Sequence, residues 1–435
     1  MTLQSLRKSA EYIIVLLLLP VLAFLVQFLF ARWSSPLYSD NFDFDQSIFY
    51  VIGRAWHDGH LPYLTAWDSK GPIIFLANML GYCIEPNIRG VFWLQCINFL
   101  LVLWAAWLCL RRVTTVAKTM VCVLLFSAAY IIISSGGNQV GDYTLALSVF
   151  TVFCTYRWSV ALQQGGVVSH PARYAFFYGL FFAACLLSRL TNAMVLSTSI
   201  MVIVLVLVWH RRWQNLLNNA IAFLLGFACC FLPFALYFYS NDVFAEMWYA
   251  MFSYNLEYAL HSHPVAFEQI GVPVVYMLFY FICLLAVPIW VLAEIVVERK
   301  GKVILWVWLA ITLPVLVWLS KSYANANYVI SYLPVLFVPV LQLMDKAMNN
   351  GAEKETVRTI RRCALASIVL VVLGGFANYV RVFRSYGQEG LPLQEAQRQM
   401  AALIPNNATM VAYNCMPSVY IYNQKLPACR FFVCQ

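Results

Sequence analysis

Residues 12–45 read YIIVLLLLPVLAFLVQFLFARWSSPLYSDNFDFD, an apolar run that passes directly into a loop with three aspartates. The run from Tyr12 to Phe30 is long enough to cross a bilayer, because about 20 residues of helix span the hydrocarbon core. It exceeds the roughly 7–15 apolar residues of a signal peptide, and no small-residue cleavage site follows it. We therefore predict a retained first span followed by an acidic loop.

Apolar runs of similar length recur along the chain. Of its 435 residues, 62% are hydrophobic and 11% are charged, whereas a soluble domain carries about 25% charged residues. We predict an all-α, polytopic integral membrane protein, because the alternating segments of roughly ten residues typical of a β-barrel are absent. Lysines and arginines fall in short clusters between the apolar runs, following the positive-inside rule. The net charge of +9 therefore indicates no nucleic-acid partner.

The basic clusters also orient the predicted spans. Arg7 and Lys8 place the amino terminus inside, so the loop over residues 31–71 lies outside the cytoplasm. The apolar run at 72–84 is short for a span, and we predict a helix at the membrane surface. About eleven spans follow from this assignment, at residues 12–30, 90–110, 119–134, 143–162, 174–188, 191–209, 217–239, 273–296, 303–319, 328–344 and 363–380.

The map divides the chain into two parts. We predict a transmembrane domain over residues 1–380, with an outer loop and juxtamembrane helices at 31–84. Residues 381–435 are predicted to form a short extracytoplasmic tail or small domain. The centres of the predicted spans are almost free of charge. A transporter or flippase, the main alternative function, needs ionisable groups near the bilayer midplane, so the pattern favours chemistry at one face.

The acidic residues gather on the predicted outer side. They are Asp40, Asp43, Asp45, Asp58, Asp68, Asp142, Asp242, Glu246, Glu257 and Glu268. The cations Lys70, Arg189 and Lys321 also fall there, against the positive-inside trend. Snorkelling to the interface is one explanation for each, and the binding of an anion is the other.

The acidic loop leads into DQSIFYVIGRAW at 45–56, where apolar residues recur at helical spacing from Ile48. We predict a helix along the membrane surface with Asp45 in its first turn, near the positive end of the helix dipole. Capping is the alternative role for Asp40, Asp43 or Asp45. Three carboxylates cannot all cap one helix, so at least one is left for another task.

Two short motifs place polar groups at the starts of apolar helices. GGNQVGDY at 136–143 puts Asp142 where a span is about to begin, either as an ordinary first-turn acid or as a second carboxylate of a site. WDSKGP at 67–72 puts Lys70 at the start of the surface helix. A cation there opposes the helix dipole but suits a phosphate held jointly with the helix amides.

Polar residues also occur at the outer ends of two later spans. SRLTN contains Arg189, and SKSYANANY contains Lys321. Tyr323, Asn327 and Tyr328 beside this lysine suit a sugar or a head group, although tyrosines are also common interface anchors.

Residues 244–258, FAEMWYAMFSYNLEY, have polar side chains at helical spacing and predict an interfacial amphipathic helix. Glu257 in this segment is predicted to face the cavity. Walker A and nucleophile-elbow motifs are absent, so neither ATP-driven nor covalent serine chemistry is indicated.

In their order, these motifs resemble those of GT-C type glycosyltransferases of the bacterial inner membrane, in the protein O-mannosyltransferase and aminoarabinose-transferase group. No single motif is specific, but together they extend over about 300 residues. They are D-x-S-x-F-x-x-x-G-R-A from Asp45, DGHLPY from Asp58, WDSKGP from Trp67, GGN…DY from Gly136, SRLTN from Ser188, MWYAMFSYNLEY from Met247 and Y…NY…P from Tyr323.

The resemblance implies that a sugar moves, with inversion, from a polyprenyl-phosphate donor in the bilayer to a hydroxyl of an envelope glycan, lipid or protein. It places this reaction at the extracytoplasmic face of the inner (plasma) membrane. Asp45 would be the base, Asp142 the second acid and Lys70 a contact of the lipid phosphate. Arg189 or Lys321 would assist the departing phosphate. The other implied substrate-binding residues are Asp43, Arg54, Asn138, Tyr143, Glu257, Tyr323, Asn327 and Tyr328.

Two departures from the pattern of such enzymes leave the sugar and the metal requirement open. Asn327 stands where relatives often carry a histidine, and Asp142 stands alone where they often carry paired acids. No cofactor is predicted with certainty, and a divalent cation, Mg²⁺ or Mn²⁺, stays open. A polymerase of lipid-linked glycans is a further alternative, but its large outer loop would be rich in arginine rather than in acids.

Overall fold

The computed structural model describes residues 11, 13–38, 44–134, 136–165, 168–261, 285–294, 302–321, 326–342, 353–385, 391–405, 408–412 and 415–432. Within these ranges the chain is helical, and its β contacts are two isolated bridges, Pro62–Ala66 and Met410–Pro427. The predicted all-α class is therefore confirmed.

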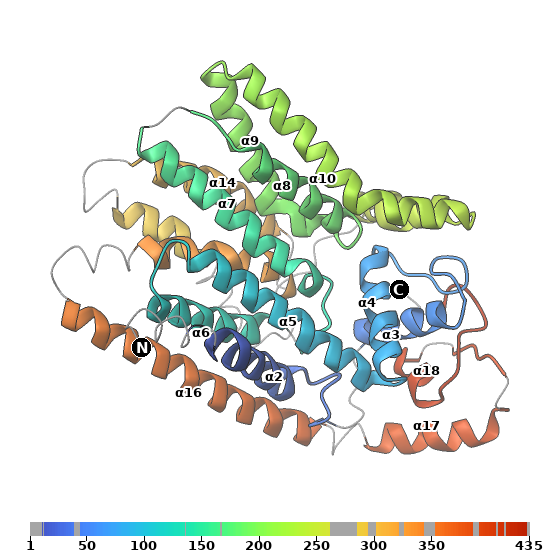
Figure 1. Cartoon of the computed structure of the whole chain (residues 1–435). Coiled ribbons are helices and arrows are strands. Elements are labelled where there is room, and N and C mark those ends of the chain that lie inside the picture. The colour runs from blue at the N-terminus through green and yellow to red at the C-terminus, as the bar shows by residue number, and fades with distance from the viewer. Residues whose placement is uncertain are drawn as a thin grey trace.

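The helices follow one another along the whole described chain (Figure 1). Those before residue 187 are η1 (Ile14–Leu18), α2 (Leu19–Phe30), α3 (Phe44–His57), α4 (Pro72–Ile84), α5 (Ile88–Leu110), α6 (Val116–Ile133), η2 (Asp142–Thr144), α7 (Leu145–Gln163) and α8 (Ala172–Leu186). Those after it are η3 (Leu190–Ala193), α9 (Met194–Trp209), α10 (Trp213–Ser240), α11 (Phe244–Trp248), η4 (Tyr249–Ser253), α12 (Tyr254–His261), α14 (Val303–Lys321), η6 (Ala326–Leu336), α16 (Glu353–Ser385), α17 (Leu391–Leu403) and α18 (Ser418–Tyr422).

Several of these helices are long and apolar enough to cross a membrane. Among the described residues they are Ile88–Leu110, Val116–Ile133, Asp142–Gln163, Leu190–Trp209 and Trp213–Ser240. Shorter apolar helices are Ile14–Phe30, Pro72–Ile84, Ala172–Leu186, Leu285–Glu294, Val303–Leu319 and Tyr328–Gln342. The polytopic membrane class agrees with this set. The count of eleven spans stays a prediction, and the predicted span at 273–296 lies mostly outside the described residues.

Helices form at both predicted segments, as α3 and α4, and their position at the membrane surface stays a prediction. Pro72 opens α4, where a missing amide hydrogen costs little. The two helices pack closely because Gly53 has no side chain: a Cβ at Gly53 would lie 2.7 Å from Cβ of Asn78. The face of α3 that includes Ile48 and Ile52 is fully buried.

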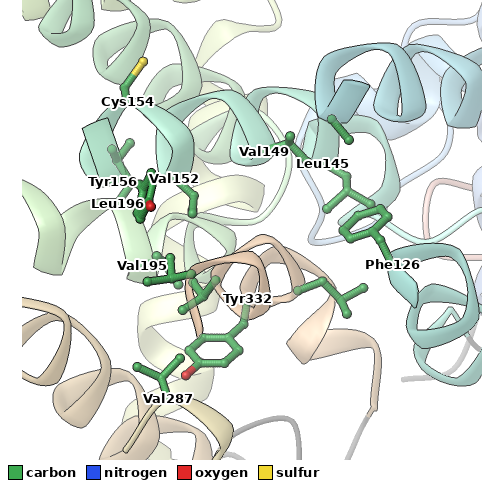
Figure 2. Packing of buried hydrophobic residues seen from close by; sticks show 14 of the residues in the cluster. Phe126, Leu145, Val149, Val152, Cys154, Tyr156, Val195, Leu196, Val287 and Tyr332 are labelled. Carbon is green, nitrogen blue, oxygen red and sulfur yellow. The ribbon is translucent and has the colours of Figure 1, made fainter. Parts of the chain in front are cut away.

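The buried side chains form two clusters. The larger joins the long helices, and Figure 2 shows Phe126, Val149, Val195 and Tyr332, from α6, α7, α9 and η6, meeting in it. The smaller joins α3 and α4 to the end of α10, to α11 and to the C-terminal segment. In Figure 1, α3, α4 and α18 lie together at one end of the long helices.

The C-terminal segment packs on this smaller cluster. The Trp67 amide donates to the Arg430 carbonyl at 3.0 Å, and Arg54 Nη2 donates to the Gln424 carbonyl at 3.0 Å. Tyr420 is 1% exposed within the cluster. The predicted division of the chain at 380 and 381 stays a prediction.

Candidate active site

The loop before α4 holds Lys70 against the end of α8. The Gly71 amide donates to the Ser188 carbonyl at 2.9 Å, and the Ile73 amide donates to the Leu187 carbonyl at 3.1 Å. A Cβ at Gly71 would lie 2.2 Å from the Leu187 carbonyl oxygen, so only glycine fits there. These amides are therefore already bonded and are not open to the phosphate that the sequence pattern suggested for them.

Lys70 itself is oriented by its neighbours in sequence. Its Nζ donates to Ser69 Oγ at 2.9 Å and lies 3.7 Å from Asp68 Oδ1. Asp68 is 1% exposed, whereas Lys70 is only half-buried. The ammonium group is therefore held by Ser69 and Asp68 and is still accessible to a ligand.

Arg189 follows directly after the two carbonyls that bind the Lys70 loop, so the two predicted cations lie on joined segments. Its guanidinium carbon stands 4.3 Å from the ring centre of Tyr328, within the range of a cation–π contact. Burial lowers the pKa of the Arg189 guanidinium, while Tyr328, Asp45 and Asp142 oppose this shift. Both predicted carboxylates therefore act on the same cation.

Asp142 is almost fully buried, at 2% exposed. Its Oδ2 accepts from the Gln139 amide at 2.9 Å, and its backbone carbonyl accepts from Asn98 Nδ2 at 3.0 Å. Its Oδ1 is buried and has no partner with hydrogen-bond geometry among the described residues, although Tyr130 also interacts with this carboxylate. The Gln139 amide thus fixes one oxygen, and the other stays incompletely paired.

Asp45 lies in the first turn of α3, as predicted, and is exposed. The next residue, Gln46, donates to the Gly137 carbonyl at 3.2 Å. This bond joins the start of α3 to the loop that carries Asp142. The surface helices and this loop therefore converge, and Asp45 and Asp142 lie at the same end of the molecule.

Asn138 and Tyr143, both predicted to bind substrate, are engaged with the protein itself. Asn138 and Asn78 exchange side-chain hydrogen bonds of 3.0 and 3.3 Å, and the Tyr143 hydroxyl donates to Asn138 Oδ1 at 2.8 Å. Asn138 also has a φ of 52°, which asparagine tolerates better than most residues. These contacts give the pair a structural task, joining α4 to the loop before α7.

Other predicted site residues lie elsewhere or are not described. Arg54 is nine residues beyond Asp45 on α3, about 13 Å along the helix axis, and it binds the C-terminal segment. Glu257 is exposed on α12 and lies 3.4 Å from the Tyr249 hydroxyl. Asp43 and Tyr323 fall outside the described residues, and only the backbone is described for Lys321 and Asn327.

Three polar residues near Arg189 escaped the sequence analysis. Thr191 Oγ1, Asn192 Nδ2 and Ser331 Oγ are buried and have no hydrogen-bond partner among the described residues. Leaving such an atom unpaired costs about 1–3 kcal/mol, so a cluster of them indicates a place for a ligand. The available signal was SRLTN itself, a polar interruption between two apolar runs.

Ser331 and Tyr328 lie on η6, a 3₁₀-helix of 11 residues, where runs beyond four residues are uncommon. Three residues per turn place side chains at i and i+3 above one another. Tyr328 contacts Arg189, and a Cβ at Gly141 would lie 3.8 Å from Ser331 Oγ. The unusual helix thereby turns both polar side chains toward the site.

A metal site finds little support among the described residues. They contain no group of three or more His, Cys, Asp or Glu side chains that could hold a metal ion. Asp45 and Asp142 both interact electrostatically with the Arg189 guanidinium, and the requirement for a divalent cation stays open.

The fold is shared with ArnT from Cupriavidus metallidurans. The crystal structure of ArnT bound to undecaprenyl phosphate has a TM-score of 0.61 at 12% identity, covering 96% of this chain and 85% of that one. The apo structure has a TM-score of 0.60 at 12% identity, covering 97% and 86%. The chain therefore has the fold of the GT-C glycosyltransferases, the class that its motifs resemble.

A family model described as "competence-induced protein Ccs4 N-terminal domain" matches residues 5–381. This match covers most of the chain, and the chain belongs to this family. No curated protein matches the sequence at a significant level.

Proposed function

We propose that this protein is a membrane glycosyltransferase that moves a sugar from a polyprenyl-phosphate donor to an acceptor hydroxyl. The observation that carries the proposal is the place of Arg189: its guanidinium stands against the Tyr328 ring, it interacts electrostatically with Asp45 and Asp142, and the two residues before it bond to the Lys70 loop. The fold shared with ArnT, one structure of which holds undecaprenyl phosphate, supports a lipid-linked donor.

Asp45 is the proposed base. An exposed carboxylate in the first turn of a surface helix can accept a proton from an acceptor that arrives from the aqueous side. The freed oxygen attacks the anomeric carbon of the donor from the face opposite the phosphate. The bond from that carbon to the phosphate oxygen breaks, and the electron pair leaves with the lipid phosphate, so the configuration inverts.

Lys70 and Arg189 are the proposed stabilisers of the leaving phosphate. Fixed cations aimed at a developing negative charge lower the barrier most when they need no rearrangement. Asp68 and Ser69 orient Lys70, and Tyr328 supports Arg189. Asp142, held by the Gln139 amide, would orient the arginine and offer its second oxygen to a sugar hydroxyl.

The compartment and the partners belong to the proposal as well. The basic loops favour an extracytoplasmic site in the inner (plasma) membrane. The acceptor is an envelope glycan, a lipid or a protein, and either a hexose or a pentose fits the arrangement of charges.

The proposal is tested with the full-length protein in a strain that lacks its gene. Mass spectrometry of membrane lipids and envelope polymers identifies the sugar that the strain loses. We expect the wild type and Asp58→Asn to restore it, because Asp58 pairs with Arg54 and His57 away from the site. Asp45→Asn should be produced at normal levels and fail to restore it. Restoration of the glycan by Asp45→Asn would remove this residue as the base.

A further inference from the structure

A crevice lies between α8, α9 and α10, in a part of the molecule that the proposed reaction does not use. α8 and α10 touch closely, because a Cβ at Gly179 would lie 1.9 Å from the Phe223 carbonyl oxygen and one at Gly226 would lie 1.9 Å from that of Phe176. α9 stands off from this pair and leaves a cavity of about 320 Å³. Figure 1 shows the α9–α10 turn far from α3 and α4.

The lining of the crevice is mostly apolar. Ala175, Ile203, Leu207, Ala220 and Phe223 are among the residues that line it. Three lining residues have polar side-chain atoms, and they are bonded to one another: His170 Nδ1 lies 2.6 Å from Asn219 Oδ1, and His170 Nε2 lies 3.4 Å from the Tyr178 hydroxyl. A volume of this order is at the lower end of the roughly 300–1,000 Å³ typical of ligand sites. With no free polar group in its wall, the crevice suits a hydrocarbon chain.

The mouth of the crevice is basic. The α9–α10 turn connects two lining residues, since the Arg212 amide donates to the Leu207 carbonyl at 2.8 Å and the Leu216 amide donates to the Arg212 carbonyl at 2.9 Å. Arg211 and Arg212 are exposed on this turn. Arg173 is exposed in the first turn of α8, where a cation opposes the helix dipole and gains from a nearby anion.

The backbone of the turn adds a second observation. Arg211 has a φ of 54° in a helix end of the type that usually places glycine at this position. An arginine is much less common than glycine in this conformation. Trp209, 84% exposed, and Trp213, 59% exposed, flank the turn, and exposed tryptophans of this kind mark the level of lipid head groups.

We propose that this crevice is a binding site for one anionic phospholipid. An acyl chain fills the space between α8, α9 and α10, and the lipid phosphate lies over Arg211, Arg212 and Arg173. The basic turn complements the negative charge of the lipid phosphate. The acyl chain supplies van der Waals contacts that the walls of an empty crevice would lack. The site is independent of the proposed transferase reaction.

The test uses the full-length protein purified in mild detergent and exchanged into mixed micelles with phosphatidylglycerol or phosphatidylcholine. Native mass spectrometry counts the lipids retained. We expect the wild type to retain phosphatidylglycerol at least tenfold better than phosphatidylcholine. Ala220→Trp, which fills the crevice, should lose this retention. Ile221→Trp introduces the same indole side chain at a position that is 51% exposed and outside the lining, and should keep it.

A second variant protects the test against a folding defect in Ala220→Trp. The double substitution Arg211→Ser and Arg212→Ser leaves the lining intact and should reduce phosphatidylglycerol retention to the level of phosphatidylcholine. Added phosphatidylglycerol should raise the Tm of the wild type and of Ile221→Trp but not that of Ala220→Trp. Equal retention of the two lipids by the wild type, or equal retention by the two tryptophan variants, would overturn the proposal. Recovery of a polyprenyl phosphate in place of a phospholipid would overturn it as well.

Discussion

Two sets of buried polar residues lie at opposite ends of α7, a helix about 28 Å long. The two sets differ in how many of their polar atoms have a hydrogen-bond partner. The first set lies near the N-terminal end of α7. Each of its members has a buried atom without a hydrogen-bond partner among the described residues; they are Asp142, Arg189, Asn192 and Ser331. Beyond its other end, His170 bonds to residues of α10 through its ring and its backbone. Burial of polar groups is therefore not by itself a sign of function here.

The pairing of the second set leaves nothing for a ligand. Asn215 and Asn219 both donate to the His170 carbonyl, at 3.0 and 2.9 Å, so Asn219 Oδ1 faces His170 Nδ1 and the ring nitrogen donates. The His170 amide donates to Asn215 Oδ1 at 2.8 Å. A paired set of this kind stabilises the fold, whereas an incompletely paired set costs stability until a ligand completes it. The comparison predicts opposite responses to substitution at the two ends.

Arg189→Gln should give the largest effect. Loss of the fixed cation should lower sugar transfer by about 10²–10³-fold, equivalent to about 2.7–4 kcal/mol. The free energy of unfolding should hold or rise, because the substitution removes a buried charge whose Nε is unpaired. Arg54→Gln is the matched control, since that arginine binds the C-terminal segment. Sugar-transfer assays and thermal melts on both variants check this. An Arg189→Gln variant that is destabilised but transfers sugar normally would show that this residue stabilises the fold and does not act in transfer.

His170 should make stability depend on pH. Burial lowers its pKa from 6.5 to about 4, with the Asn219 hydrogen bond acting against the shift. Between these values the unfolded chain binds the proton and the folded chain does not, so stability rises with pH. The contribution is complete above pH 6.5 and is lost by pH 4, a change of roughly 3 kcal/mol.

The measurement is the Tm of the purified protein between pH 7 and pH 4. His170→Gln should show a flatter curve than the wild type, whereas His210→Gln, at an exposed position, should follow the wild type. Identical curves for all three proteins would exclude His170 as the titrating group.

Asn219→Ala should lower the free energy of unfolding by about 1–3 kcal/mol, because it leaves His170 with an unpaired donor in a buried place. Transfer by the folded fraction should be unchanged. Asn218→Ala, one residue away and exposed, should change stability by no more than about 0.5 kcal/mol. Chemical unfolding followed by tryptophan fluorescence measures the free energy of unfolding of both variants. Equal losses of stability would show that the hydrogen bonds of Asn219 do not account for its contribution.

Lys70→Ala should give the smallest effect. Loss of one charged contact to the donor phosphate should raise the apparent KM for the donor by about tenfold, with a smaller change in kcat. Lys70→Arg keeps the charge and should recover most of the affinity. Kinetics at varied donor concentration separate the two constants, and an unaltered KM would assign the donor phosphate to other cations.

The motifs that resemble those of the GT-C enzymes are short, local patterns in the sequence. Such patterns were enough to predict the helices that carry them. The helical spacing of apolar residues predicted α3, a short apolar run predicted α4, and the lone Asp142 was found where an apolar run begins. The contacts that assemble the site were beyond such patterns. Nothing near Gly71 in the sequence indicates that it lies against Leu187, and nothing near Asn138 indicates its exchange with Asn78.

The same limit explains the residues that were misplaced or missed. Arg54 belongs to the Asp45 motif but faces Gln424, a partner 370 positions away. Ser331 could not be singled out, because only the 3₁₀ geometry of η6 aligns it with Tyr328. Composition and helical periodicity describe one segment at a time, and a site made from five segments depends on how they dock.

The bonds that join Gly71 and Ile73 to Leu187 and Ser188 have a consequence for variation in this protein. Main-chain hydrogen bonds fix the spacing of the two segments that carry Lys70 and Arg189, so exchanging side chains around these cations would change that spacing little. A methyl group at position 71 would clash with the Leu187 carbonyl and drive the two segments apart, so a single glycine sets the distance between the two proposed phosphate-binding cations.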